Sequence, residues 1–185
     1  MTRTILFAVL FLLTSGAYAQ VTDSVRRQKT STILYAGAGP QLAFGLLQES
    51  HAVGAQVEAG GYTQFARKNI AVRRLPLLFN WSIAGNYYSG RKVEVAGHPY
   101  TYKSYWLVHA YAGAALPFGK SWMGSVQVGP GIGNYMGQAD FNAGVQATLN
   151  YAVGNHIIVY ASVNGMKEPG TNWLGAAGVG VRWRK

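Results

Sequence analysis

The chain has no cysteine among its 185 residues, which excludes disulfide bonds and metal sites with thiolate ligands. Charged residues are also scarce, at 12% of the composition, and 6 of them are acidic against 16 that are basic. Beyond the N-terminal region, no apolar run approaches the roughly 20 residues that a transmembrane helix needs. The lack of such a run excludes a helical membrane protein.

The first residues have the pattern of an export signal. Arg3 supplies a positive start, residues 5–13 are an unbroken apolar run, and Ala17-Tyr18-Ala19 has the small-x-small pattern of a cleavage site ahead of Gln20. We therefore expect residues 1–19 to be a signal peptide that is removed on export. An exported chain with 49% hydrophobic residues and no membrane helix is either a secreted β-rich domain or a membrane β-barrel.

The clearest strand pattern lies at residues 141–153. The odd-numbered positions from Phe141 to Val153 are all apolar, and the even-numbered positions between them are Asn, Gly, Gln, Thr, Asn and Ala. Because successive side chains of a strand point to opposite faces, this segment is a strand with one apolar and one neutral polar face. The polar face has no Lys or Glu, so it fits the enclosed interior of a small transmembrane barrel.

The same alternation recurs along the chain and predicts eight strands. The 24 glycines and the 13% of aromatic residues also suit a barrel, in which Gly relieves crowding while Trp and Tyr ring the membrane interfaces. The predicted strands are residues 34–44, 52–65, 75–88, 101–116, 122–134, 141–153, 156–164 and 173–184.

We therefore expect an all-β fold, an eight-stranded antiparallel up-and-down transmembrane β-barrel at residues 32–185, preceded by a periplasmic segment at residues 20–31. The rival fold is a soluble barrel or sandwich whose apolar faces point inward. The uncharged polar faces favour the membrane barrel, and so do aromatic residues near the strand ends, where they would form an interface girdle. These aromatic residues are Tyr87, Tyr88, Tyr100, Tyr102, Trp122, Tyr135, Trp173 and Trp183.

The connections are expected to alternate in length. Residues 117–120 and 154–155 have tight-turn sequences, as periplasmic turns should, whereas the links after the third, fifth and seventh strands are predicted to be longer outer loops. Residues 67–74 are longer than a periplasmic turn needs, and an extension of a neighbouring strand into this link would account for the extra length. Gly60-Gly61 is predicted to mark a β-bulge, because the alternation is less regular beyond it.

At this point a family resemblance is visible. The signal peptide, the eight alternating segments and the last strand, Gly178-Val179-Gly180-Val181-Arg182-Trp183, resemble the small outer-membrane β-barrel proteins of Gram-negative bacteria. Residues 74–81 look like a Leu-Pro-Leu-Leu strand of many of those barrels. The resemblance implies a location in the cell outer membrane and the outer-membrane assembly machinery as a partner. Such barrels commonly end on an aromatic residue that this machinery reads, whereas Arg184 and Lys185 follow Trp183 here.

The formal net charge is +10, and the basic residues cluster between the predicted strands rather than along them. Such clusters keep charge out of the apolar band and can attract the phosphates of lipid headgroups. We therefore expect outer-membrane lipid and lipopolysaccharide headgroups as partners, no nucleic acid, and a monomeric barrel. The clusters lie at residues 26–29, 67–68, 73–74, 91–92 and 182–185.

Several polar residues share the inward phase and are candidates for a hydrogen-bonded network in the lumen. A carboxylate enclosed there needs a cationic or donor partner, and for Glu58 the sequence leaves Arg182, Lys103 and His109 as candidates. The four histidines show no metal-ligand spacing, so neither a metal nor another cofactor is expected. The candidate network residues are Glu58, His109, Tyr111, Gln127, Gln146 and Arg182.

The expected function is non-enzymatic, with a structural or surface-interaction role. Side chains just fill the interior of an eight-stranded barrel, which disfavours a wide diffusion pore. One alternative is enzymatic, since residues 160–170 look like the His-x-Ser-Asn segment of outer-membrane lipid A deacylases, with Ser162 at the position of the nucleophile. Tyr160 replaces the His, and His156 lies six residues from Ser162, so the Ser-His relay is broken. A second alternative is a narrow channel.

Overall fold

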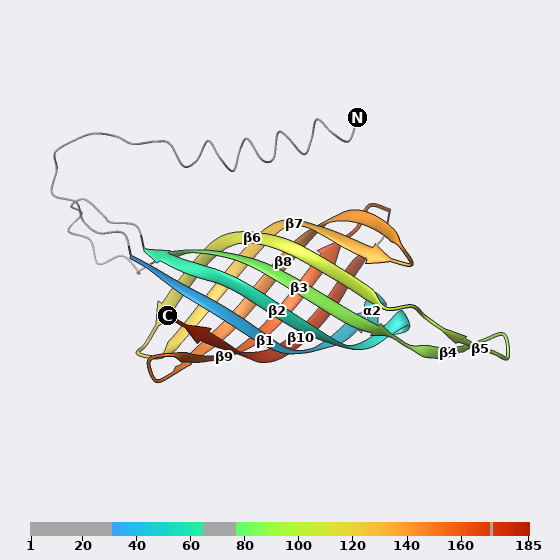
Figure 1. Ribbon diagram of the computed structural model, residues 1–185, viewed down its shortest axis with the longest axis horizontal. Helices are drawn as coiled ribbons and strands as arrows, with labels where there is room; N and C mark the ends of the chain where they lie inside the picture. Colours follow the sequence, from blue (N-terminus) through green and yellow to red (C-terminus); the bar gives the residue numbers. More distant parts are fainter. Residues whose placement is uncertain (1–30, 65–76, 171) are drawn as a thin grey trace, which may run out of the picture.

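The computed structural model describes residues 31–64, 77–170 and 172–185. In this part of the chain, eight antiparallel strands close into a barrel in the order β1-β10-β9-β8-β7-β6-β3-β2, while β4 and β5 form a separate hairpin (Figure 1). The predicted eight-stranded antiparallel barrel is therefore confirmed. The elements are β1 (Ser31–Gly45), α2 (Leu46–Ser50), β2 (His51–Gln64), β3 (Leu78–Gly90), β4 (Lys92–Val95), β5 (His98–Thr101), β6 (Tyr105–Phe118), β7 (Trp122–Tyr135), β8 (Gln138–Val153), β9 (Ile157–Lys167) and β10 (Trp173–Arg184).

Some sequence-based predictions concern residues that the structure does not describe. The expected signal peptide at residues 1–19 and the connection at residues 67–74 lie outside the described ranges, and so does most of the expected periplasmic segment. Within the described ranges, no helix has the length and apolar character required to cross a membrane.

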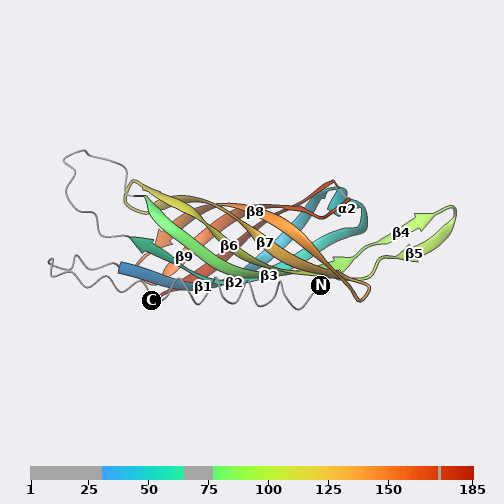
Figure 2. The same ribbon diagram turned by 90° about the horizontal axis from the view of Figure 1, so that it is seen from above.

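Pairing between β1 and β10 closes the barrel. The two strands pair antiparallel from Tyr35 opposite Arg184 to Gly45 opposite Leu174, and the backbone N–H of Lys185 donates to the Leu34 carbonyl at 3.0 Å. Each barrel strand therefore has a partner on both sides, which protects the backbone polar groups that an edge strand would expose. The start of β1 and the end of β10 share one end of the barrel, the terminal end. The opposite end, which carries α2 and the β4–β5 hairpin, is the hairpin end (Figures 1 and 2).

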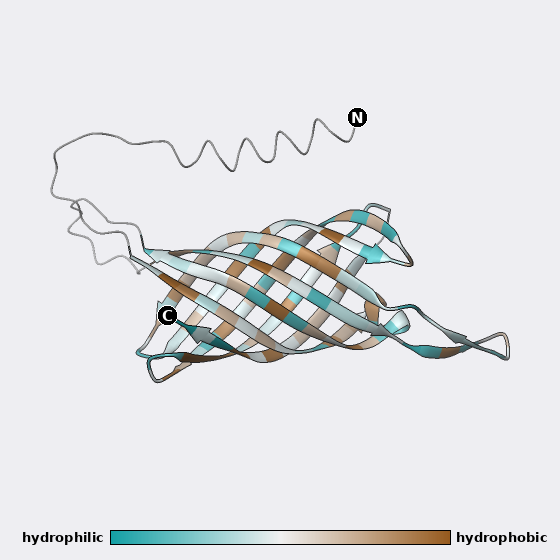
Figure 3. Cartoon of the chain, in the orientation of Figure 1, coloured by the Kyte–Doolittle hydropathy of each residue, from teal (hydrophilic) through white to brown (hydrophobic). Residues whose placement is uncertain are grey.

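The apolar rows of the strands point outward and the polar rows point inward, which excludes the rival fold with an apolar core. On β8, Phe141 is 72% exposed, whereas Gln146 and Asn150 are each 1% exposed. On β10, Val179 is 57% exposed and Arg182 is fully buried. Figure 3 shows the resulting alternation of hydrophobic and hydrophilic residues along the strands. This arrangement is that of a transmembrane barrel, with an apolar wall around a polar interior.

The predicted fourth strand begins too early. Residues 101–104 are predicted at its start, but β6 begins at Tyr105, and Thr101 instead ends the short strand β5. β5 pairs with β4 around Ala96 and Gly97, whose φ angles of 51° and 79° are both positive, as a type I′ hairpin turn requires. Sequence reasoning missed this hairpin because each strand has four residues, too few for alternation to stand out.

The predicted long loop between the fifth and sixth strands is wrong. Met136 and Gly137 alone join β7 to β8, and their φ angles of 55° and 84° again fit a two-residue hairpin turn. The two strands continue past the apolar band, where Asn134 pairs with Ala139 and the alternation that marks a strand fades. At the terminal end the tight turns are confirmed, because residues 119–121 and 154–156 make the links.

The β-bulge predicted at Gly60-Gly61 is also wrong. The pairing of β2 with both neighbours runs unbroken through these residues, and the irregularity lies between His51 and Gly54. A Cβ atom on Gly60 would lie 2.3 Å from the Trp81 carbonyl oxygen, and one on Gly61 would lie 3.0 Å from the Trp81 ring. The two glycines therefore allow close approach of β3 instead of accommodating an extra residue.

Two of the aromatic residues assigned to the interface girdle pack against the apolar cluster at the hairpin end instead of lying on the outer wall. Trp122, Trp173 and Trp183 do lie on the outer wall, with exposures of 44%, 57% and 60%. Tyr88, by contrast, is fully buried in the apolar cluster at the hairpin end, and Tyr135 packs against the same cluster. Proximity to a strand end predicted a girdle, but the phase of the strand decides which face a ring occupies.

Close approach of neighbouring strands in the wall requires glycine at some positions, and substitution by alanine can test this requirement. A Cβ atom on Gly129 of β7 would lie 1.8 Å from the Ala110 carbonyl oxygen, whereas at Gly85 of β3 the nearest atom is a Val57 methyl group at 3.5 Å. We expect Gly129→Ala to destabilise the barrel by about 1–3 kcal/mol, because backbone must move to admit the methyl group. Gly85→Ala is the matched control and should be close to neutral. Urea unfolding in detergent would compare them, and equal unfolding midpoints would contradict this account of the wall.

Candidate functional site: the polar interior

The guanidinium group of Arg182 lies at the centre of the interior network. Its Nε atom is 2.5 Å from Glu58 Oε1, and its Nη2 atom donates to Glu58 Oε2 at 3.0 Å, so the ion pair is bidentate. Nη1 donates to the Tyr62 hydroxyl at 2.8 Å and also to the Asn150 side-chain carbonyl. Side chains from β2, β8 and β10 thereby meet across the lumen.

Two aromatic rings flank the same guanidinium group. Its carbon lies 4.6 Å from the centroid of the Tyr35 ring and 4.4 Å from that of the Tyr160 ring. The quadrupole of each ring attracts the cation, and the planar guanidinium suits such stacking better than a lysine ammonium would. Gly37 leaves room for this side chain, since a Cβ atom there would lie 2.6 Å from Arg182 Cγ.

Of the three partners that the sequence left open for Glu58, the structure brings Arg182 to it. Lys103 lies in the link between β5 and β6, where it is exposed, and its backbone carbonyl faces His51 instead. His109 stacks on Tyr111 with ring centroids 5.0 Å apart and an interplanar angle of 12°. A buried charge is costly unless it is paired and hydrogen-bonded, and Glu58 and Arg182 meet both conditions for each other.

A layer of amide side chains lies beside this ion pair. Gln41 Nε2 donates to Gln56 Oε1 at 2.5 Å and to the Ser162 hydroxyl at 3.3 Å. Asn164 Nδ2 donates to the side-chain carbonyls of Gln41 at 3.2 Å and Gln56 at 3.3 Å. Ser162 is 4% exposed, so its hydroxyl belongs to this interior layer.

The remaining predicted network residues fall into separate groups. Gln127 Nε2 donates to the Ser82 hydroxyl at 3.2 Å, which links β7 to β3. Within the described residues, neither ring nitrogen of His109 and neither amide atom of Gln146 has a hydrogen-bond partner. The sequence thus selected six inward-facing residues, and the structure joins Glu58 and Arg182 directly.

Sequence reasoning missed the residues that complete the environment of Arg182, namely Tyr35, Tyr62, Asn150 and Tyr160. Their strand phase places all four inward, so alternation could have assigned them to the lumen. Alternation could not show which inward residues meet, because that depends on the stagger between strands around the closed barrel. Tyr62 was also hidden behind the bulge wrongly predicted at Gly60-Gly61.

Apolar clusters close the interior on both sides of the polar section. At the hairpin end, Leu47 of α2 packs with Tyr88, Tyr105, Leu107 and Met166, and all five side chains are at most 4% exposed. Nearer the terminal end, the rings of Tyr35 and Tyr62 stack at 4.9 Å, and Leu78 and Met123 pack against them. The lumen is therefore layered, with a polar section between two apolar ones.

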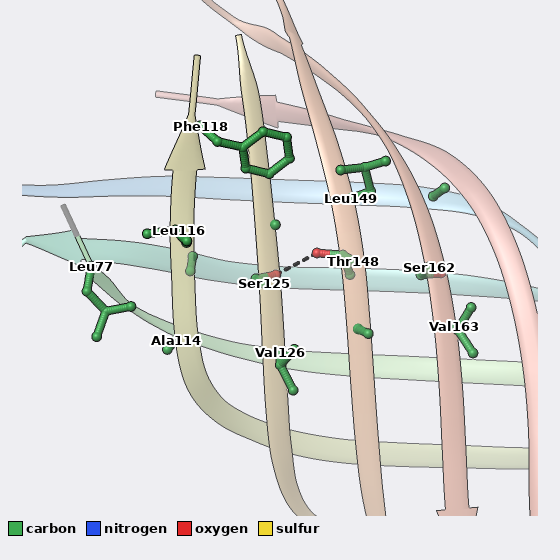
Figure 4. A pocket seen from close by; sticks show the side chains of 14 residues that line it. Leu77, Ala114, Leu116, Phe118, Ser125, Val126, Thr148, Leu149, Ser162 and Val163 are labelled. Atoms are coloured by element: carbon green, nitrogen blue, oxygen red, sulfur yellow. Dashed lines mark hydrogen bonds between the residues drawn. The ribbon is translucent and has the colours of Figure 1, made fainter. Parts of the chain in front are cut away.

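The outer wall carries a shallow apolar depression of about 600 Å³ across β6 to β9 (Figure 4). Its lining combines the small side chains of Ala114, Ala147 and Ala161 with the larger ones of Leu77 and Phe118. Ser125 and Thr148 lie behind it and share an interior hydrogen bond of 2.6 Å, drawn as a dashed line in Figure 4. This depression has the chemistry of the rest of the lipid-facing wall.

The two residues named for a catalytic relay are not brought together. Ser162 points into the lumen, whereas His156 lies exposed in the link between β8 and β9, with its Nδ1 atom 3.3 Å from the Arg184 carbonyl oxygen. Among the described residues, no group of three or more His, Asp or Glu side chains is arranged as a metal site.

Comparison with known proteins places the fold. No protein-family model and no curated protein matches the chain. Among solved structures it is similar to the Yersinia pestis outer membrane protein Ail in a phospholipid bilayer nanodisc, with a TM-score of 0.56 and 11% identity over 84% of this chain and 100% of that one. For Ail in complex with the heparin analogue sucrose octasulfate, the TM-score is 0.52 and the identity 14%, over 84% of this chain and 98% of that one.

The N-terminal β-barrel domain of Pseudomonas aeruginosa OprF is similar as well, with a TM-score of 0.50 and 15% identity over 85% of this chain and 100% of that one. At such identities the likeness concerns the fold. The expected resemblance to small outer-membrane barrels is therefore confirmed in the architecture.

Removal of the Glu58 charge tests the interior ion pair. We expect Glu58→Gln to destabilise the barrel by about 3–5 kcal/mol, because the buried Arg182 charge loses its counter-ion. Combining Glu58→Gln with Arg182→Met should recover part of that loss, since no unpaired charge remains. Glu94→Gln on the exposed face of β4 makes the same change outside the barrel and should stay within about 0.5 kcal/mol of the parent protein. Urea unfolding measures all four proteins, and an unchanged midpoint for Glu58→Gln would show that the pair is not stabilising.

Proposed function

We propose that this chain, a barrel with the fold of small outer-membrane proteins, works in the outer membrane as a closed, non-enzymatic barrel that presents its hairpin end at the cell surface. The observation that carries this proposal is the fully buried Arg182, held by Glu58 and two tyrosine rings inside an apolar-walled barrel. Such an interior fills and stabilises the barrel, so contacts with partners fall to its two ends.

The outer wall supports a membrane location. Val57, Ile83 and Val128 have exposures of 62%, 58% and 59%, which would be unfavourable for such large apolar rows in water. Outward-facing Trp122 and Trp183 near the terminal end, and Trp173 at the other, suit the two membrane interfaces. The similar solved structures named above are outer-membrane proteins, which favours this membrane over others.

The layered lumen supports a closed barrel. An aqueous channel needs a continuous path for water, but side chains from opposite walls meet in the polar section, and apolar clusters cover it on both sides. Eight strands leave an interior that side chains just fill. The Ser162 hydroxyl accepts a hydrogen bond from Gln41 within this filled interior, which supports a structural role for Ser162.

The basic residues support contact with lipid headgroups at both ends. Arg91 and Lys92 are exposed at the hairpin end, and Lys120 and Lys185 are exposed at the terminal end. Residues placed just beyond an apolar band can reach the phosphates of lipids or of lipopolysaccharide. Their positions would fix the depth of the barrel in the membrane.

The β4–β5 hairpin supports a role in surface interaction. It projects past the end of the barrel along its long axis, as Figures 1 and 2 both show. All four residues of β5 are exposed. A projecting pair of strands with exposed side chains is suited to contact a partner rather than to stabilise the barrel.

Cysteine labelling tests the proposed orientation, because the natural chain contains no cysteine. A cysteine at His98, in the hairpin, should react with a membrane-impermeant maleimide on intact cells. A cysteine at Lys120, in a terminal-end turn, should react after the outer membrane is permeabilised. If Lys120→Cys is labelled on intact cells and His98→Cys is not, the terminal end faces outward and the proposed orientation is wrong. If neither cysteine is labelled in a membrane fraction, the proposal that the two ends are exposed on opposite sides of the membrane is wrong.

Conductance measurements test the closed lumen. The purified protein in planar lipid bilayers should give no stable current steps, since apolar clusters interrupt any path for hydrated ions. An open porin at the same protein concentration is the control for insertion. Reproducible steps whose frequency rises with the amount of this protein would establish a narrow channel instead.

A further inference from the structure

A cavity of about 250 Å³ at the hairpin end is lined by rings and carboxylates. The His51 ring centroid lies 5.8 Å from that of Tyr105, 6.0 Å from that of Tyr135 and 6.5 Å from that of Tyr102. Tyr105 and Tyr135 are themselves 6.4 Å apart and meet edge to face. Aromatic side chains from three separate parts of the chain thus gather around one space.

Strand ends and the adjoining links position these rings. His51 begins β2 directly after α2, Tyr105 begins β6, and Tyr135 ends β7, so all three lie where the regular strands stop. His51 is past the outward-facing aromatic residues of the wall, because it pairs with Gly90, three residues beyond Tyr87. The cavity therefore lies outside the apolar band and opens at the hairpin end.

Hydrogen bonds fix the His51 ring. Nε2 is 3.0 Å from the Lys103 carbonyl oxygen, which can only accept, so Nε2 carries the proton. Nδ1 is 2.8 Å from the Ser50 hydroxyl, which also lies 3.4 Å from the Leu47 carbonyl oxygen. Burial lowers the pKa of His51 below its usual range, although the bond to Lys103 opposes this. The imidazole is therefore neutral at neutral pH.

The charge of the cavity lining consequently comes from Asp140 on β8 and Glu168 after β9. The chain has 6 acidic residues against 16 basic ones, so two carboxylates on one small cavity give it a sign opposite to that of the whole protein. The Tyr105 hydroxyl donates to Glu168 Oε1, which fixes that carboxylate beside the rings.

We propose that this cavity binds an organic cation, an alkylammonium or guanidinium head group. Aromatic faces attract such cations through their quadrupoles, and the attraction grows when the cation is partly removed from water. Two carboxylates add long-range attraction and exclude anions from the same space. A strongly hydrated inorganic ion would gain little from tyrosine rings, which favours an organic head group.

The inference rests on the proposed function in one respect, since the ligand reaches the cavity from outside the cell only if the hairpin end faces outward. The same chemistry has two sources, a free small molecule such as a choline-type ammonium or an arginine side chain of a partner protein. Both would place a cation among the rings and against the carboxylates.

The test compares choline with its uncharged isostere, 3,3-dimethylbutan-1-ol, by calorimetric titration of the full chain in a maltoside detergent that has no choline group. Choline should bind, and the isostere, which has the same shape, should bind about tenfold more weakly or not at all. Equal affinities for the two compounds would overturn the proposal. This comparison uses the parent protein, so it does not depend on whether a variant folds.

Variants then locate the site. Asp140→Asn with Glu168→Gln should weaken choline binding about tenfold, whereas Glu94→Gln on the hairpin, which removes a carboxylate outside the cavity, should leave the Kd unchanged. Tyr135→Phe keeps the ring and should keep the affinity within about twofold, whereas Tyr135→Leu should lose it. Unchanged binding in both the double variant and Tyr135→Leu would overturn the assignment to this cavity. Heat-dependent gel mobility confirms that each variant is folded.

A second titration separates the two sources. A Gly-Arg-Gly peptide that binds more tightly than choline, and more tightly than the same peptide with citrulline, would assign an arginine side chain, whereas tighter binding of choline would assign a free ammonium. Binding of neither would overturn the proposal. These titrations use purified protein, so their outcome does not depend on how the barrel is oriented in the cell. If choline binds but His98→Cys is not labelled on intact cells, the proposed orientation is wrong and the cation site stands. If His98→Cys is labelled but choline does not bind, the cation site is wrong and the orientation stands.

Discussion

The buried charge of Arg182 is the constraint on which the rest of the interior depends. A guanidinium group that is 0% exposed needs a counter-ion, hydrogen-bond acceptors and polarisable neighbours, and the barrel supplies them from four other strands. Glu58 neutralises the charge, Asn150 and Tyr62 accept hydrogen bonds, and the rings of Tyr35 and Tyr160 lie against the guanidinium group. Each of these contacts is long-range in the sequence, so the ion pair joins strands that lie far apart along the chain.

This centre follows from the wall that surrounds it. Hydrocarbon on the outside requires apolar outward rows, which leaves every polar group of the alternating strands inside. Eight strands make a narrow cylinder, so each inward position carries either a side chain that packs against its neighbours or a glycine. Glycines such as Gly37 and Gly129 stand where a Cβ atom would meet a side chain or a neighbouring backbone. The same crowding that stabilises the ion pair fills the lumen, so the proposed structural role and the proposed closed lumen have one physical origin.

The hairpin end does not follow the strand alternation of the barrel wall. Past the apolar band there is no lipid to enforce alternation, so the chain forms a five-residue helix, a small hairpin and a two-residue turn there. Freed from that constraint, the chain gathers three tyrosines, a histidine and two carboxylates around one cavity. The described links at the terminal end, by comparison, are the short turns at residues 119–121 and 154–156, and Lys120 and Lys185 are exposed there. The proposed cation site therefore lies at one end of the barrel, apart from the ion pair in its interior.

Alternation alone predicted the eight strands and the inward position of the network residues, because a period of two is enforced wherever one face meets lipid and the other is enclosed. It failed where that enforcement stops, at the β4–β5 hairpin, at the extension of β7 and β8, and at residues 101–104. It also could not choose among Arg182, Lys103 and His109 as the partner of Glu58. The sequence by itself determined which face of each strand is polar and which is apolar. Only closure of the barrel decided which of the inward polar residues meet. The stagger between neighbouring strands, and not the order of residues along any one of them, sets the contacts across the lumen.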